Sequence, residues 1–167
     1  MPRRKAKPSK YVKTESVDRK YGSPLIKKFA NMLMKDGKYN KAYKSLCDAL
    51  ETVVIKSKGN LTDELMKQEV LNLMEELIEK AGPEVEVKSK RIGGATYPVP
   101  IVVQKSRKIA LAFRWLIRFA RKRTGAIAKC LEQEFLDVLA GRGSTVNERE
   151  NLHRMARANM AFANIKR

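Results

Sequence analysis

The segment 84–103 places the tightest limits on the fold. Both halves of it alternate between apolar residues on one face and other residues on the opposite face, and Gly93-Gly94 separates them. This pattern predicts two antiparallel strands joined by a tight turn, because glycine adopts positive φ at little cost. Pro98 and Pro100 remove N–H donors from one and the same edge of the second strand, so that edge has to be unpaired. The segment should form a two-stranded ribbon that cannot grow into a wider sheet.

Helical spacing occupies the chain on both sides of this ribbon. Ser23 and Pro24 have the chemistry of an N-cap and a first helical residue, and Thr145 and Glu148 have the spacing of a capping box. The expected helices run from Ser23 to Asp36-Gly37, Tyr39 to Lys58, Thr62 to Gly82, Ser106 onward, Ile127 to Gly141, and Thr145 onward, with Leu152, Met155, Ala156 and Phe162 on the buried side of the last. The sequence predicts a mainly α protein, a six-helix fold with a protruding two-stranded antiparallel β-ribbon between the third and fourth helices.

Residues 1–20 are interpreted as a basic N-terminal tail, and residues 21–167 as a single helical domain. The tail has few apolar residues, so alone it cannot bury enough surface to offset the entropy lost on ordering. We expect it to be disordered in the free protein, with Arg3, Arg4, Lys5 and Lys10 ordering on a polyanion. A solubilising tail is the plainer alternative.

The charge of the chain is strongly one-sided. The net charge is +18, and the stretch from Lys88 to Lys129 contains lysine and arginine but no acidic residue. Nucleic acid is the leading partner, because a phosphate chain presents many negative charges along one surface. An anionic membrane surface is the rival, although no apolar run approaches the roughly 20 residues of a membrane span. The third helix concentrates carboxylates, and we expect it to face solvent or a basic protein.

The helix expected from Ser106 has two chemically different faces. One sector, at about 100° per residue, contains Ile109, Phe113, Leu116 and Ala120, and the opposite side contains Arg107, Arg114, Arg118 and Arg121. Arginine forks match phosphate oxygens in a bidentate geometry, so we expect this side to face nucleic acid. Trp115 and Phe119 are expected at the edge of the core, with base stacking as the alternative.

Candidate groups for catalysis are scarce. His153 is the single histidine, and Cys47 and Cys130 lie far apart in helical patterns. Buried reduced thiols are expected, with a disulfide as the alternative. No Cys/His cluster and no glycine-rich phosphate loop occurs, so the sequence predicts neither a metal site nor a cofactor. His153 is expected at the surface or in a cap, and we do not expect an enzyme.

Five stretches of the chain carry a family resemblance. They are Met1-Pro2-Arg3-Arg4, Lys20-Tyr21-Gly22-Ser23, KRIGGATYPVP from Lys90 to Pro100, AFRWL from Ala112 to Leu116, and NLHRMA from Asn151 to Ala156 followed by Asn159, Ala161, Phe162 and Ala163. Over nearly its whole length the chain resembles the family of small-subunit ribosomal protein number seven, in its bacterial or organellar form.

The resemblance implies a structural constituent of the small ribosomal subunit. It implies primary binding to 16S-type rRNA, in the 3′ major domain, and nucleation of head assembly. It also implies a position beside the exit-site tRNA near the mRNA exit path, and contacts with neighbouring head and platform ribosomal proteins. The implied location is the cytoplasmic ribosome, with an organellar ribosome left open, and no membrane is involved.

The resemblance also assigns site residues by match of motif. The rRNA candidates are Arg3, Arg4, Lys5, Lys35, Lys38, Lys88, Lys90, Arg91, Arg107 and Arg114, to which the basic tail adds Lys10 and the arginine face adds Arg118. The tRNA-side candidates are Gly93, Gly94, Ala95, Thr96, Tyr97, Arg142, Gly143, Arg149 and His153.

Two other functions compete with rRNA binding. A DNA-bending architectural protein could use the ribbon as a wedge. Such proteins usually act as dimers, however, and no pattern in the sequence indicates a dimer interface. Association with a membrane surface would use the apolar side of the helix from Ser106, which is also the best core stripe in the chain.

Overall fold

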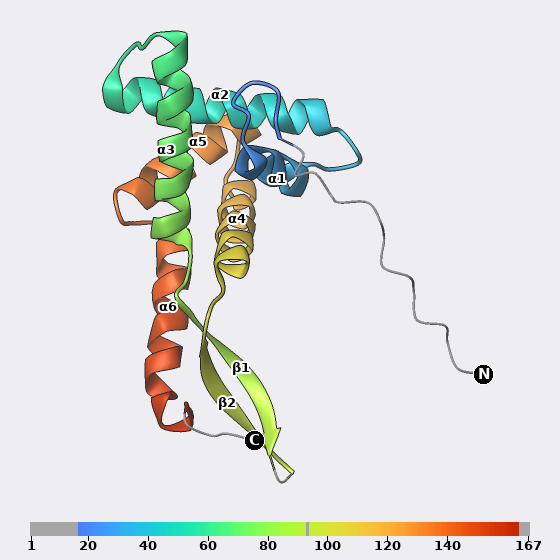
Figure 1. The fold of residues 1–167 in the computed structure, drawn as a ribbon, viewed down its shortest axis with the longest axis vertical. Helices are drawn as coiled ribbons and strands as arrows, with labels where there is room; N and C mark the ends of the chain where they lie inside the picture. Colours follow the sequence, from blue (N-terminus) through green and yellow to red (C-terminus); the bar gives the residue numbers. More distant parts are fainter. Residues whose placement is uncertain (1–16, 93, 164–167) are drawn as a thin grey trace, which may run out of the picture.

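The structure is a computed structural model that describes residues 17–92 and 94–163 (Figure 1). The elements in chain order are α1 (Pro24–Leu33), α2 (Tyr39–Lys58), α3 (Asp63–Ala81), β1 (Val85–Ile92), β2 (Ala95–Val102), α4 (Lys105–Lys122), α5 (Ile127–Leu139), α6 (Ser144–Ala158) and the 3-10 helix η1 (Met160–Phe162). Six helices with a two-stranded antiparallel ribbon between α3 and α4 confirm the predicted fold class.

Three phenylalanines from different helices meet at the centre of the helical domain. The ring centroid of Phe29 in α1 lies 4.9 Å from that of Phe113 in α4 and 6.0 Å from that of Phe135 in α5, both edge-on. All three rings are completely buried. Burying a side chain of this size contributes about 1.5–3 kcal/mol, so this contact is a main source of cohesion between α1, α4 and α5.

The helix ends agree with the sequence in some places and differ in others. Helix α2 has the predicted bounds and ends at Gly59, whose φ is +79°. Helix α1 stops at Leu33, short of the predicted end at Asp36-Gly37, and α4 begins one residue early, at Lys105.

The predicted capping box of α6 is wrong. The N-cap residue is Gly143, and the Thr145 hydroxyl instead donates a buried hydrogen bond of 2.7 Å to the Glu134 carboxylate. Glu148 accepts a hydrogen bond from Arg118 at 2.8 Å. Both side chains are thus occupied by tertiary contacts, which override the local capping pattern.

The ribbon has the register that the prolines require. Ser89 lies opposite Pro98, Val87 lies opposite Pro100, and the Val103 N–H donates to the Glu84 carbonyl at 2.8 Å. Hydrogen-bonded and non-bonded pairs alternate in an antiparallel ladder, so both prolines occupy non-bonded positions. Their ring nitrogens face the outer edge, as predicted, and within the described residues the sheet stops at two strands.

Helix α6 and η1 run alongside the ribbon and brace it (Figure 1). The rings of Tyr97 and Phe162 have centroids 5.6 Å apart, and Ala156 is buried. Met155, predicted on the buried side, is instead 50% exposed. The difference arises because this half of α6 has left the helical core and packs against a narrow ribbon.

Asp18 orders the chain just before α1. Its carboxylate accepts hydrogen bonds from the backbone N–H groups of Lys20, Tyr21 and Ser23, at 2.7–3.0 Å, and from the Tyr43 hydroxyl at 2.9 Å. Residues 17–20 therefore belong to the folded domain rather than to a disordered tail. The remainder of the predicted tail, residues 1–16, lies outside the described residues.

Candidate nucleic-acid interface

The described rRNA candidates fall into three groups on the fold. Lys88, Lys90 and Arg91 lie on β1, the arginines 107, 114 and 118 lie on α4, and Lys35 and Lys38 lie in the loop between α1 and α2. Arg3, Arg4, Lys5 and Lys10 lie outside the described residues.

The ribbon carries cations on both of its faces. Lys88 and Lys90 share a face with Glu86, and Arg91 points to the other. The ammonium group of Lys88 lies 3.0 Å from the Glu86 carboxylate. Lys90 and Arg91 are exposed, and no carboxylate lies within 4.0 Å of either in the part of the chain that the structure describes. These two side chains are available to an external anion.

The arginine face of α4 is only partly neutralised. Arg107 Nε donates to Glu86 at 2.7 and 2.9 Å, and Arg118 donates to Glu148 at 2.8 Å. Arg114 is exposed and has no carboxylate partner among residues 17–92 and 94–163. The opposite face of α4, including Phe113 and Leu116, is buried in the core, so it is unavailable to a membrane surface.

The two aromatic residues beside this face differ in exposure. Trp115 is buried, while Phe119 is half-buried. The guanidinium carbon of Arg118 lies 4.6 Å from the Phe119 ring centroid, and the ammonium of Lys122 lies 5.3 Å from it. Both residues lie at the edge of the core as predicted, and Phe119 holds two cations in place through cation–π contact.

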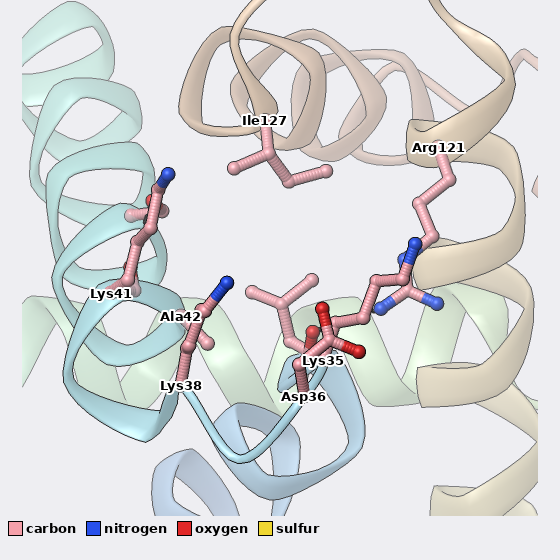
Figure 2. A pocket seen from close by; sticks show the side chains of 9 residues that line it. Lys35, Asp36, Lys38, Lys41, Ala42, Arg121 and Ile127 are labelled. Carbon is pink, nitrogen blue, oxygen red and sulfur yellow. Dashed lines mark hydrogen bonds between the residues drawn. The ribbon is translucent and has the colours of Figure 1, made fainter.

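A third basic group surrounds a cavity that the sequence did not reveal. Figure 2 shows the side chains of Lys35, Lys38 and Arg121 around a central space, with Ile127 across from them. Arg121 donates to the Leu33 carbonyl at 2.9 Å, which ties the end of α4 to the end of α1. Lys35 and Lys38 were sequence candidates, but nothing in the periodicity linked them to Arg121 on a distant helix.

The tRNA-side candidates do not form one cluster. The described residues of the ribbon tip, Gly94 to Tyr97, lie at one end of the molecule (Figure 1). Arg142 and Gly143 precede α6, whose 15 residues extend over about 22 Å toward that tip. Arg142 donates to Asp137 at 3.3 Å. Gly93 lies outside the described residues.

Arg149 and His153 hold the base of the ribbon. Arg149 donates to the Lys80 carbonyl at 2.5 Å, near the end of α3. His153 Nε2 accepts the backbone N–H of Glu84 at 3.0 Å. Burial, followed by the nearby charge of Arg149, lowers the pKa of His153 below its ordinary value, and this favours the neutral ring that the hydrogen bond needs.

Carboxylates converge at one place that the sequence did not predict. Glu134 is 1% exposed and accepts hydrogen bonds from Arg123, at 2.7 and 3.0 Å, and from Thr145. Asp137 accepts a further bond from Arg123 at 2.6 Å. Burial opposes the charge of Arg123, but these hydrogen bonds outweigh it and raise its pKa. The group is fully engaged in joining α5 to the segments on either side.

Other expectations concern chemistry that nucleic-acid binding does not need. Cys47 and Cys130 are buried thiols rather than a disulfide, as predicted. Among the described residues, no group of three or more His, Cys, Asp or Glu is placed to hold a metal ion. None of the helices in residues 17–92 and 94–163 combines the length and apolar character needed to cross a bilayer.

Comparison with known proteins identifies the family. The model of the family described as ribosomal protein S7p/S5e matches residues 2–160. The chain belongs to the ribosomal protein S7p/S5e family. Membership makes it an RNA-binding protein of the translation machinery, and confirms the resemblance seen in the sequence motifs.

Full-length bacterial relatives support membership of the S7p/S5e family. The chain is 45% identical over 167 residues, 99% of both chains, to the small ribosomal subunit protein uS7 of Alkalilimnicola ehrlichii. It is 42% identical over 167 residues, again 99% of both chains, to the protein of that name from Pseudomonas fluorescens. The uS7 of Dichelobacter nodosus is 45% identical over 150 residues, which cover 89% of this chain and 90% of the relative.

Proposed function

We propose that this protein is a structural constituent of the small ribosomal subunit and a primary 16S-type rRNA-binding protein. In this proposal it nucleates assembly of the head domain and lies at the tRNA exit site near the mRNA exit path of a cytoplasmic ribosome. Its relatives carry the name of a small ribosomal subunit protein. The observation that carries the proposal is the exposure of three cations, Lys90, Arg91 and Arg114, none of which has a carboxylate partner in the described chain.

The proposed mechanism is scaffolding rather than catalysis. A folded RNA junction brings phosphates close together, where they repel one another. Cations fixed on a braced ribbon and a helix neutralise those phosphates and hold the junction in one geometry. Readout is expected through the shape and backbone of the RNA more than through base edges, because A-form helices hide their bases in a deep, narrow groove.

We divide this work among the three basic groups. Lys88 and Lys90 share the face of β1 that Arg107 and Glu86 join to α4, so these lysines and the α4 arginines are held in a fixed relation to one another, while Arg91 lies on the other face of the ribbon. The group around Lys35 and Lys38 forms a second contact. The tRNA contact is proposed at the ribbon tip, with His153 and Arg149 holding the ribbon base instead of touching the tRNA.

The proposed contact with neighbouring head and platform proteins lies at two exposed methionines. Met155 in α6 and Met160 in η1 are 50% and 65% exposed. Methionine adapts its shape to a partner, so this region is the proposed protein contact.

Binding to an rRNA junction fragment tests the proposal. The fragment should bind the purified protein more tightly than an unrelated duplex of equal length. By analogy with DNA, six to ten phosphate contacts reduce affinity about 10³–10⁵-fold between 50 and 200 mM salt. A variant with Arg107, Arg114 and Arg118 changed to glutamate should lose the fragment. Equal affinity for both RNAs argues against the function, and tight binding by the variant argues against the site.

A further inference from the structure

A cavity lies where the loop between α1 and α2 meets the end of α4 and the start of α5 (Figure 2). Its volume is about 500 Å³, within the range of about 300–1,000 Å³ of small-molecule sites. Leu33, Ala42 and Ile127 contribute an apolar wall. The cavity differs from the basic surfaces of the ribbon and α4 because it offers depth and apolar contact as well as charge.

Cations dominate the polar part of this cavity. Lys35, Lys38, Lys41 and Arg121 line it, against the single carboxylate of Asp36. None of these four cations has a carboxylate within 4.0 Å among residues 17–92 and 94–163. In Figure 2 the Lys38 ammonium and the Arg121 guanidinium are directed toward the central space. The lining therefore carries excess positive charge without an internal counter-ion.

The same loop makes a tight left-handed turn before α2. Asp36 has φ +53°, the one positive value outside glycine in the described chain, and Gly37 follows with φ +70°. The loop delivers the chain to the N-terminus of α2, where Lys38 provides no capping side chain and the first turn has no acidic residue. Backbone N–H groups and the helix dipole there favour an anion.

The combination of an apolar wall and a cationic rim selects a particular kind of ligand. A phosphate alone would leave the half-buried Ile127 side chain and the apolar part of the lining uncovered, and an apolar ligand would leave the cations without a counter-ion. An unstacked nucleotide supplies both parts, a flat base and a phosphate. The Arg121 guanidinium, held by its bond to the Leu33 carbonyl, provides a planar cation on which a base can stack.

We propose that this cavity holds one extruded, unpaired nucleotide of the bound RNA. The base lies against Leu33, Ala42 and Ile127, and its phosphate lies against Lys38, Lys41 and the N-terminus of α2. The proposal rests on the proposed rRNA-binding function and adds a distinct mode of contact to it. The ribbon and α4 contact the RNA backbone, whereas this cavity takes a single base out of the stack.

Nuclear magnetic resonance of the full chain tests this directly with three probes at matched ionic strength. They are adenosine 5′-monophosphate, ribose 5-phosphate and inorganic phosphate. The nucleotide should shift the methyl resonances of Leu33, Ala42 and Ile127 as well as the amides of Asn40 and Lys41. The other two probes should shift only the amides. The dissociation constant for the nucleotide should be at least fivefold below that for phosphate.

Substitutions inside and outside the cavity provide matched controls. Ser45 lines the cavity and Ser57 lies on the same helix, α2, away from it. Ser45→Leu fills the space without changing charge and should abolish the nucleotide shifts, whereas Ser57→Leu should leave them intact. Ile127→Gln removes part of the apolar wall and should weaken the binding of the nucleotide but not that of phosphate. If circular dichroism shows that Ser45→Leu does not fold, Ile127→Gln tests the proposal in its place.

Each outcome decides the proposal. Equal affinity for phosphate and nucleotide, or nucleotide shifts that survive both Ser45→Leu and Ile127→Gln, overturns it. If the nucleotide does not shift the cavity resonances while the rRNA junction still binds selectively, the cavity inference is wrong and the proposed function stands. If the nucleotide fills the cavity but the junction is bound no better than an unrelated duplex, the proposed function is wrong.

Discussion

Arg107 Nε donates to both carboxylate oxygens of Glu86, at 2.7 and 2.9 Å, and joins the first turn of α4 to the base of β1. Glu86 is 7% exposed. Burial would raise its pKa, but the hydrogen bonds from Arg107 and Lys88 prevail and hold the pKa below its ordinary value. The Nη groups of Arg107 make no hydrogen bond within the described chain, so Arg107 can fix the ribbon and still donate to a phosphate.

Replacing Arg107 with alanine should lower the free energy of unfolding by about 1–2 kcal/mol. A hydrogen bond to a charged group contributes about 1.5–3 kcal/mol, and partial exposure of the arginine reduces this. Urea unfolding followed by circular dichroism gives the value. Arg114→Ala is the matched control, since Arg114 lies on the same helix without a carboxylate partner among the described residues, and it should stay within about 0.5 kcal/mol of the original. Equal losses from the two variants would contradict a structural role for the Arg107–Glu86 pair.

Arg114→Ala should instead weaken RNA binding without changing stability. Loss of one phosphate contact should reduce affinity for the rRNA junction fragment and lower the slope of log K against log salt by about 1. Filter binding from 50 to 300 mM salt measures the slope. Lys67→Ala, on the acidic helix α3, removes the same charge from a different surface and should leave the slope nearly unchanged. If Arg114→Ala has the same slope as the original protein, Arg114 does not contact a phosphate of the RNA.

Glu134→Leu should destabilise the fold by about 2–4 kcal/mol. The change leaves the buried hydroxyl of Thr145 without its acceptor and removes one of the two carboxylates that bind Arg123. Breaking a buried ion pair on one side costs about 3–5 kcal/mol, and Arg123 is partly exposed, which reduces the loss. Urea unfolding against Glu150→Leu, an exposed position on α6, gives the comparison. A loss below 1 kcal/mol would show that the cluster contributes little to stability.

His153 should make the ribbon base sensitive to mild acid. Its pKa is lower in the folded chain than in the unfolded one, so its stabilising contribution is complete above the unfolded value of about 6.5. That contribution declines as the pH falls through the folded pKa, because protonation removes the acceptor for the Glu84 N–H. Amide hydrogen exchange at Glu84 should therefore accelerate, relative to the intrinsic rate, between pH 7.5 and 5.5.

The matched variant for this pH dependence is His153→Gln. Its side-chain oxygen can accept a hydrogen bond and does not titrate in this range, so the relative protection of Glu84 should become independent of pH. The same acceleration in both proteins would assign the effect to another group.

Restoring the two missing N–H donors on β2 should promote self-association. Pro98→Thr with Pro100→Thr creates a hydrogen-bonding edge that another ribbon can pair with, since both positions face outward in the register. Sedimentation velocity at 10 and 200 μM should show a concentration-dependent dimer for the double variant and a monomer for the original chain. Ser89→Thr, on the other strand at the same level, adds no donor and should remain monomeric.

The sequence predicted those parts of the fold that depend on local chemistry. Gly59 ends α2, and the prolines put the outer edge of the ribbon where the structure has it, because each effect acts within a few residues. Predictions from the sequence were wrong where a side chain with a local capping pattern binds a partner far away in the chain. Thr145 and Glu148 have capping spacing, but Glu134 and Arg118 bind them instead. Asp18 likewise finds Tyr43, 25 residues away, and orders a stretch predicted to be tail.

The candidate site was predictable as a set of charges but not as a geometry. Lys90 and Arg114 are exposed as their patterns required, and Arg91 is exposed although strand alternation places it on the face of Val85 and Val87. The positions of Glu86 and Glu148 in space decide which arginines have N–H groups left to donate to a phosphate, because these carboxylates accept hydrogen bonds from Arg107 and Arg118. The cavity beside Lys38 needs residues from α1, α2, α4 and α5, and no periodicity within one segment brings these together.

The acidic helix α3 has a consequence for the rate of encounter. Its exposed carboxylates include Asp63, Glu64, Glu75, Glu76 and Glu79, while β1 and α4 carry exposed cations. Such separation of opposite charges gives the molecule a permanent electric moment. In the field of a polyanion this moment turns the molecule before the two touch, so that productive collisions become more frequent. Low ionic strength should therefore raise the association rate constant for RNA as well as lower the dissociation rate constant.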